Sequence, residues 1–203
     1  MAITKIHAIQ ATVNKAVDYI CNPAKTDERI LISSFGCSPK TAAFDFKFAL
    51  SKTNQADPNK AFHLIQAFMP GEVSYKEAHQ IGIELADKLL EGKYSYIVAT
   101  HIDKGHVHNH IIFCAADNIN HEEYHDCKKT YYHIRHLNDE LCFEHQLSVL
   151  PPLTSVEKHT RNGSPTNAIP HGKPGSKMTL TKLSKLLILM RTFLTLSMPK
   201  DMR

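Results

Sequence analysis

The chain has 203 residues, 42% of them hydrophobic, and no uncharged apolar run of about 18 residues, so we expect one globular domain without a membrane span. The first residues lack the apolar core of a signal peptide, and five cysteines without paired spacing indicate a reducing compartment, so we expect a cytoplasmic protein. Residues 151–203 carry a net charge of +7 and residues 1–150 carry −3. The net charge of residues 1–150 therefore does not indicate nucleic-acid binding, and any DNA-binding surface there must be a local patch.

The first half of the chain predicts strands and helices in alternation. Residues 2–10 alternate in polarity and predict a strand, after which Asn14 is a suitable cap for a short amphipathic helix. Residues 30–35 predict a second strand. A helix is expected over residues 38–52, because Pro39 would stand at its first helical position, where proline is tolerated.

A third strand and two longer helices follow. Residues 61–69 alternate and predict a strand. Ser74 and Glu77 have the spacing of a capping box, so a helix should begin after Ser74 and end near Gly92. Residues 130–145 carry apolar side chains at helical spacing and predict the last helix of this part.

The most informative stretch is residues 101–110, which holds four of the 14 histidines. Apolar runs at 96–99 and 111–113 flank it, and two such runs joined by a short polar turn predict a β-hairpin. Because side chains alternate along a strand, three of the histidines should share one face of the second strand, with the fourth at the end of the first strand. The first strand ends at His101, and the second carries His106, His108 and His110.

The expected order is therefore β-α-β-α-β-α-β-β-α, and the hairpin requires antiparallel neighbours. We expect an α+β fold, a mainly antiparallel sheet of about five strands with helices packed on it, over residues 1–150. Residues 151–178 are rich in Pro, Gly, Ser, Thr and Asn and predict a linker. Residues 179–203 predict a basic amphipathic C-terminal segment.

Several imidazoles on a rigid sheet suit a metal ion with open coordination positions, and zinc, manganese, nickel and iron all accept such ligands. The competing interpretation is a solvated, histidine-rich turn. A bound divalent cation can polarise a phosphoryl oxygen, and the attacking group would then be either a metal-bound water or a side chain.

Tyr19 is a candidate for that side chain, because it lies at the end of a short helix and is followed by polar and basic residues such as Lys25. A phenol has a pKa of about 10, so attack at neutral pH needs a base or a nearby cation. The structural alternative is an amphipathic tyrosine at the edge of the core. The rival tyrosines are Tyr75, Tyr94, Tyr96, Tyr124, Tyr131 and Tyr132.

Two motifs resemble those of conjugative relaxases, the mobilisation nucleases of the HUH endonuclease superfamily. The third motif of that family has His-x-Asp, then His-x-His entering a strand, and often an Asn a few residues later. The matching residues here are His101, Asp103, His108, His110 and Asn118. Tyr19 followed six residues later by Lys25 resembles the first motif, and the segments 34–38 and 68–72 also fit. The resemblance covers about residues 1–150 and implies the relaxase-like arrangement of a sheet with helices, in two layers or as a sandwich.

The resemblance implies an enzyme that nicks single-stranded DNA at a transfer origin and can rejoin it, in conjugative transfer or mobilisation. Tyr19 would attack the scissile phosphate and form a 5′-phosphotyrosyl link. A divalent ion, Mn²⁺ or Mg²⁺ first and Zn²⁺ or Ni²⁺ as alternatives, would be held by a set of ligands. These ligands are His101, His108 and His110, with His106 as a substitute. An accessory DNA-binding protein and the coupling protein of a type IV secretion system are the implied protein partners.

Four further residues receive expected roles. Asp103 would orient a ligand histidine or, alternatively, cap its own turn. Lys25 would contact phosphate or help to lower the pKa of Tyr19, the alternative being a solvated lysine. Asn118 and Ser38 would contact DNA or support the local structure.

The family's name implies an apolar residue between the two histidines of His-x-His, where this chain has Asn109. On a strand that side chain points away from the metal, so we expect it to alter packing and not chemistry. Two other functions stay open. One is a metal-dependent phosphodiester hydrolase that uses a metal-bound water, and the other is a non-catalytic DNA-binding or replication-initiation module.

Overall fold

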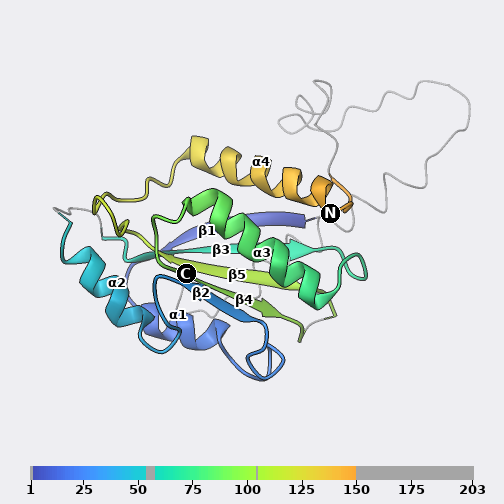
Figure 1. Cartoon of the computed structure of the whole chain (residues 1–203), viewed down its shortest axis with the longest axis horizontal. Coiled ribbons are helices and arrows are strands. Elements are labelled where there is room, and N and C mark those ends of the chain that lie inside the picture. The colour runs from blue at the N-terminus through green and yellow to red at the C-terminus, as the bar shows by residue number, and fades with distance from the viewer. Residues whose placement is uncertain (1, 54–57, 104, 150–203) are drawn as a thin grey trace, which may run out of the picture. The chain divides into compact units, whose positions relative to one another are not determined.

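The computed structural model describes residues 2–53, 58–103 and 105–149 (Figure 1). The predicted linker over 151–178 and the predicted amphipathic segment over 179–203 lie outside the described residues, so both stay predictions. Within the described ranges, no helix combines the length and the apolar character needed to cross a bilayer.

The order of elements is β-α-β-α-β-α-β-β-α, which confirms the expected order. The strands are β1 (Ala2–Ile9), β2 (Ile32–Phe35), β3 (Ala61–Phe68), β4 (Tyr96–His101) and β5 (His108–Cys114). The helices are α1 (Val13–Ile20), α2 (Ala42–Leu50), α3 (Tyr75–Leu90) and α4 (Lys128–Glu144). As predicted, the Ser74 hydroxyl caps α3 by accepting a hydrogen bond from the backbone N–H of Glu77.

The five strands form one sheet in the order β1-β3-β5-β4-β2, and every pairing in it is antiparallel. The predicted histidine hairpin is the pair β4–β5 near the middle of the sheet, with His101 directly opposite His108. Strand β5 begins at His108, so the prediction that His106 lies on this strand was wrong. A central strand is paired on both sides and is the most rigid place that a sheet offers. The expectation of an α+β fold on a largely antiparallel sheet is confirmed.

Helices cover both faces of this sheet, so the arrangement is a sandwich of helix, sheet and helix (Figure 1). On one face, buried side chains of α1 and α2 pack against Ile97, Ala99 and Ile112. On the other, α3 and α4 cover a larger core that includes Phe62 and Phe113. Because successive strand residues point to opposite faces, the even-numbered residues of β5 face α1 and α2.

Two predicted helix starts were wrong. Helix α1 begins at Val13 with Thr12 as its N-cap, two residues earlier than an Asn14 cap would place it, because Val13 is itself buried on the apolar face of the helix. Helix α2 begins at Ala42 and not near Ser38. The Ser38 carbonyl accepts the N–H groups of Thr41 and Ala42, so residues 38–41 form a separate turn before the helix.

Asn109 lies on the face opposite to its neighbouring histidines and is fully buried beneath α3. Its amide nitrogen donates to Gln66 Oε1 (2.9 Å) and to the carbonyl of Ala78 in α3 (2.6 Å), and its oxygen accepts from Thr100 Oγ1 (2.6 Å). Gly82 leaves the room for it, since a Cβ there would stand 2.5 Å from Asn109 Nδ2. The departure from the family pattern therefore acts on packing, as expected, and ties β5 to α3.

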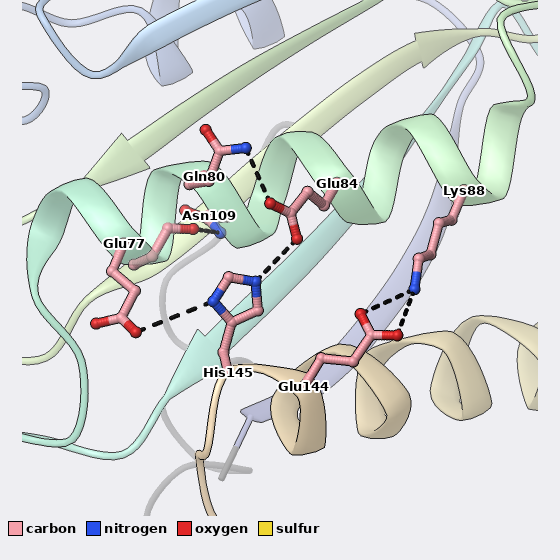
Figure 2. Close-up of polar contacts among 8 residues, drawn as sticks. Glu77, Gln80, Glu84, Lys88, Asn109, Glu144 and His145 are labelled. Atoms are coloured by element: carbon pink, nitrogen blue, oxygen red, sulfur yellow. Dashed lines mark hydrogen bonds and ion pairs between the residues drawn. The ribbon is translucent and has the colours of Figure 1, made fainter.

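Polar pairs join α3 to the end of α4 (Figure 2). The His145 Nε2 atom lies 2.8 Å from Glu84 Oε2, and its Nδ1 atom lies 4.0 Å from Glu77 Oε1. One turn further along α3, Lys88 Nζ pairs with Glu144 at 3.0 Å. These groups are partly exposed, so each pair contributes little to stability on its own, and together they link α3 to the end of α4.

Candidate active site

Three histidines meet where β4 ends and β5 begins. His101 faces His108 across the two strands, and His110 follows two residues later on the same face of β5. All three are buried, and one nitrogen of each lies within 4.8 Å of the others. Metal–nitrogen bonds of about 2.1 Å place two ligand nitrogens at most about 4.2 Å apart, so these rings need to move only slightly inward to hold one ion.

The neighbours of two of these histidines decide which nitrogen can bind a metal. His101 Nε2 lies 2.9 Å from the backbone oxygen of Ile20, near the last turn of α1, where helix carbonyls have no partner within the helix. A carbonyl can only accept, so Nε2 carries the proton and Nδ1 carries the lone pair of the neutral ring. His110 Nδ1 lies 2.8 Å from His63 Nε2, and its other nitrogen, Nε2, is buried without a hydrogen-bond partner in the described part of the chain.

The protein environment keeps His108 and His110 neutral. Burial, reinforced by the neighbouring histidines, lowers the pKa of His110 well below its usual value of about 6.5 and that of His108 to about 3. A neutral imidazole has a lone pair to give to a metal, whereas a protonated one has none. The buried Nε2 of His110, the neutral rings and the spacing together fit a divalent cation.

Tyr19 lies directly beside this cluster. The buried residues of α1 anchor the helix on the sheet and leave Tyr19 half-buried on its flank. Its ring centroid lies 5.7 Å from that of His101 and 5.9 Å from that of His110, in edge-to-face arrangements. The hydrogen bond from His101 to the end of α1 therefore holds the helix, and with it the tyrosine, against the histidines.

Lys25 and Asp103 complete the arrangement around the tyrosine. Lys25 Nζ lies 4.1 Å from the centroid of the Tyr19 ring and 3.9 Å from Asp103 Oδ2. The backbone N–H of Ile102 donates to the Lys25 carbonyl at 3.0 Å, which fastens the loop after α1 to the end of β4. The charge of Asp103 also counters part of the lowering of the His108 pKa.

The remaining predicted residues are placed differently. His106 is half-exposed and stacks on His108, with ring centroids 5.2 Å apart, but it is not part of the three-nitrogen group. Asn118 and Ser38 lie toward the opposite end of the strands. Asn118 exchanges hydrogen bonds with Ser95, which precedes β4, and Ser38 lies in the turn before α2. The structure thus brings Tyr19, Lys25, Asp103 and the histidines together, but not Asn118 or Ser38.

Two histidines beside the site were not predicted: His63, fully buried on β3, and His7, half-buried on β1. They face each other in the register of the two strands, with ring centroids 4.8 Å apart. The period of two within each strand predicts the face of each residue. It does not predict that β3 and β1 follow β5 in the sheet, so the contact between His63 and His110 could not be predicted from the sequence.

Comparison with known proteins agrees with this arrangement. The family model for the MobA/VirD2-like relaxase nuclease domain matches residues 19–147, a span that begins at the candidate tyrosine. Protein rlx of Staphylococcus aureus is 34% identical over 149 residues, which are 73% of this chain and 43% of rlx. The group II intron-interrupted relaxase LtrB of Lactococcus lactis subsp. cremoris is 29% identical over 121 residues, which are 47% of this chain and 22% of LtrB.

A solved structure shares the fold. The MobM relaxase domain, in a Mn-bound crystal structure with plasmid pMV158 oriT DNA, has a TM-score of 0.53 at 9% identity and covers 77% of this chain and 96% of its own. At that identity the likeness concerns the fold alone. The chain spans less than half the length of either curated relative that it matches.

Proposed function

Because this chain belongs to the MobA/VirD2-like relaxase family, we propose that it nicks and rejoins single-stranded DNA at a specific origin of transfer, with Tyr19 as the nucleophile. The observation that carries the proposal is the position of Tyr19, whose ring lies within 6 Å of two rings of the three-histidine group. A tyrosine placed beside a metal site needs no large rearrangement to reach a phosphate held there.

In the proposed step the Tyr19 oxygen attacks the scissile phosphorus. A bond from phosphorus to the tyrosine oxygen forms, the bond from phosphorus to the 3′ oxygen breaks, and the phenolic proton is released while the 3′ oxygen takes up a proton. The products are a 5′-phosphotyrosyl link and a free 3′-hydroxyl. In the reverse step the 3′-hydroxyl displaces Tyr19 and the strand is rejoined, without any external energy source because one phosphodiester replaces another.

His101, His108 and His110 would hold the divalent ion, with Mn²⁺ or Mg²⁺ as the first candidates. When bound, the ion polarises the phosphate and offsets the charge that develops during attack. Lys25 adds positive charge beside Tyr19, which favours the phenolate that attacks. Asp103 keeps the Lys25 ammonium in place.

The DNA substrate is inferred from the MobM structure, which contains oriT DNA. Residues 1–150 carry a net negative charge. We therefore infer that the DNA binds to a local basic patch that includes Lys25, because the domain as a whole does not attract phosphates. An accessory DNA-binding protein and a coupling protein of a secretion system belong to the same proposal, in conjugative transfer or mobilisation.

The deciding experiment incubates the full chain with single-stranded oligonucleotides from the origin region and Mn²⁺ or Mg²⁺. A covalent protein–DNA adduct should appear on a denaturing gel, and mass spectrometry should map the link to Tyr19. Tyr19→Phe should form no adduct but bind the oligonucleotide as before, whereas Tyr131→Phe, a change at an exposed tyrosine on α4, should leave adduct formation intact.

Two results would replace the proposal with one of its alternatives. Metal-dependent cleavage that survives in Tyr19→Phe, without any adduct in the wild type, would indicate a hydrolase. Oligonucleotide binding that survives chelation, without cleavage under any metal condition, would indicate a DNA-binding module.

A further inference from the structure

A row of three histidine rings, two of them fully buried, extends from the three-histidine group toward the β1 edge of the sheet. His110 on β5 contacts His63 on β3, and His63 contacts His7 on β1. His63 is completely buried, and it lies diagonally from His110 because Ile65 is the residue directly opposite His110. A fully buried histidine without a role is unexpected, since burying a polar ring is unfavourable unless it is hydrogen-bonded.

The contact between the two rings is a short hydrogen bond, 2.8 Å from His63 Nε2 to His110 Nδ1. Both rings are completely buried, where a charged ring is very unfavourable, so both are neutral. A neutral imidazole has one N–H and one lone pair, so only one of the two nitrogens in this bond carries the proton. The choice decides the chemistry of His110.

If Nδ1 of His110 carries the proton, its Nε2 has the lone pair and is a metal ligand. If Nε2 of His63 carries it instead, the proton of His110 sits on Nε2 and blocks that ligand. His110 Nε2 and His63 Nδ1 are both buried without a hydrogen-bond partner among the described residues, so each arrangement leaves one buried N–H unsatisfied, and the two differ in what His110 Nε2 presents to the three-histidine group. The first arrangement leaves only a lone pair at that position, which a cation can use.

We propose that His63 is a positioning residue that accepts the Nδ1 proton of His110 and thereby fixes the tautomer and ring orientation in which His110 binds the metal. The role resembles that of the carboxylates and carbonyls that orient metal-binding histidines in general, but a second histidine performs it here. The proposed function supplies the premise that the three-histidine group holds a divalent ion.

The remaining proton of His63 is then on Nδ1, which has no hydrogen-bond partner within the described chain. The His7 and His63 rings meet edge to face, with centroids 4.8 Å apart and an interplanar angle of 63°. His7 therefore packs against the side of His63 that is away from His110 only through ring contact, with no hydrogen bond to it among the described residues. His7 does not touch the bond to His110, so it offers a matched control.

The test measures binding of Mn²⁺ and Co²⁺ to the full chain by calorimetry, without DNA. His63→Phe keeps a ring in the buried space but cannot accept a proton, and it should weaken metal binding about 10- to 100-fold. His63→Gln places an amide oxygen where Nε2 stood and should restore affinity to within about threefold of the wild type. His7→Phe should change affinity less than about threefold. A thermal melt of each variant identifies loss of folding.

A spectroscopic readout separates positioning from packing. Long-range ¹⁵N–¹H spectra of the metal-free protein should show the Nδ1–H tautomer of His110 in the wild type and in His63→Gln, and a mixture of tautomers in His63→Phe. Equal metal affinity of His63→Phe and wild type, or a gain in affinity, would overturn the inference, because a gain means that His63 normally donates to His110.

Metal binding and adduct formation separate the positioning role of His63 from the nucleophilic role of Tyr19. Tyr19→Phe should bind the ions like the wild type, since Tyr19 is not one of the ligands. If no adduct forms but His63→Phe weakens metal binding, the positioning role stands and the tyrosine mechanism falls. If adducts map to Tyr19 but His63→Phe binds metal normally, the mechanism stands and the positioning role falls.

Discussion

The Lys25 ammonium lies over the Tyr19 ring, 4.1 Å from its centroid, at the point where the chain leaves α1. This contact accounts for the spacing of six residues between them, since the turn after α1 folds back and returns Lys25 to the helix it has just left. Asp103 holds the other side of the ammonium at 3.9 Å. The three side chains unite the end of α1, the following turn and the end of β4 around one candidate nucleophile.

We expect Lys25→Met to slow adduct formation about 2- to 30-fold, which corresponds to the ~0.5–2 kcal/mol of a cation held over an aromatic ring. Lys25→Arg should retain most of the rate, because it keeps the charge. Initial rates on a single-stranded oligonucleotide measure the effect, and Lys15→Met on the exposed side of α1 is the control. Equal rates for Lys25→Met and Lys15→Met would show that Lys25 is only a solvated charge.

Single alanine variants of the four hairpin histidines should separate ligands from bystanders. His101→Ala, His108→Ala and His110→Ala should each abolish detectable Mn²⁺ binding and metal-dependent nicking, because each removes one of three nitrogens. His106→Ala should reduce affinity much less, since His106 stacks on His108 outside the three-nitrogen group. If calorimetry ranks His106→Ala as more damaging than His101→Ala, the ligand set must be changed.

Gly82→Ala should destabilise the protein by about 1–3 kcal/mol, although alanine favours helices, because the new Cβ would collide with the Asn109 amide. Asn109→Ala should also destabilise it, because the partners of Asn109 are left unsatisfied in the core. In a double-mutant cycle by urea unfolding, Gly82→Ala should cost less once Asn109 is alanine. Strictly additive losses would mean that the two side chains do not compete for space.

The Glu84 carboxylate accepts hydrogen bonds from His145 and Gln80 (Figure 2), and these contacts make its contribution to stability depend on pH. Burial raises the pKa of Glu84, but hydrogen bonds from His145 and Gln80 and the nearby Lys88 charge outweigh burial, so the pKa lies below its usual value. A carboxyl whose pKa is lowered on folding stabilises the protein above the unfolded-state pKa, and this contribution is lost as pH falls through the folded-state pKa.

At neutral pH Glu84→Gln should therefore be less stable than the wild type, and the difference should shrink as pH falls below about 4.5. Urea unfolding at several pH values measures it. The control is Glu140→Gln, a change at an exposed residue of α4. If the difference in unfolding free energy between the wild type and Glu84→Gln stays constant as pH falls below about 4.5, the loss of stability comes from altered packing and not from the lost charge.

The periodicity of apolar residues was sufficient to predict the order of strands and helices, because periods of two and 3.6 residues depend only on residues close together in the chain. It was insufficient for the start of α2. Ser38 and Pro39 have the residue types of a helix start, but the Ser38 carbonyl closes a turn of its own before Ala42. Residue types such as Ser followed by Pro favour the start of a helix, but the backbone hydrogen bonds around them decide whether a turn or a helix forms.

The sequence by itself determined the histidine hairpin, because a turn between two strands places His101 beside His108, and alternation places His110 on the same face. Only the tertiary structure decided what surrounds the hairpin. The strand order sets His63 next to His110, and the packing of α1 sets Tyr19 beside both His101 and His110. Strand order and helix docking depend on burial of apolar surface across the whole chain, and no local spacing of residues encodes them.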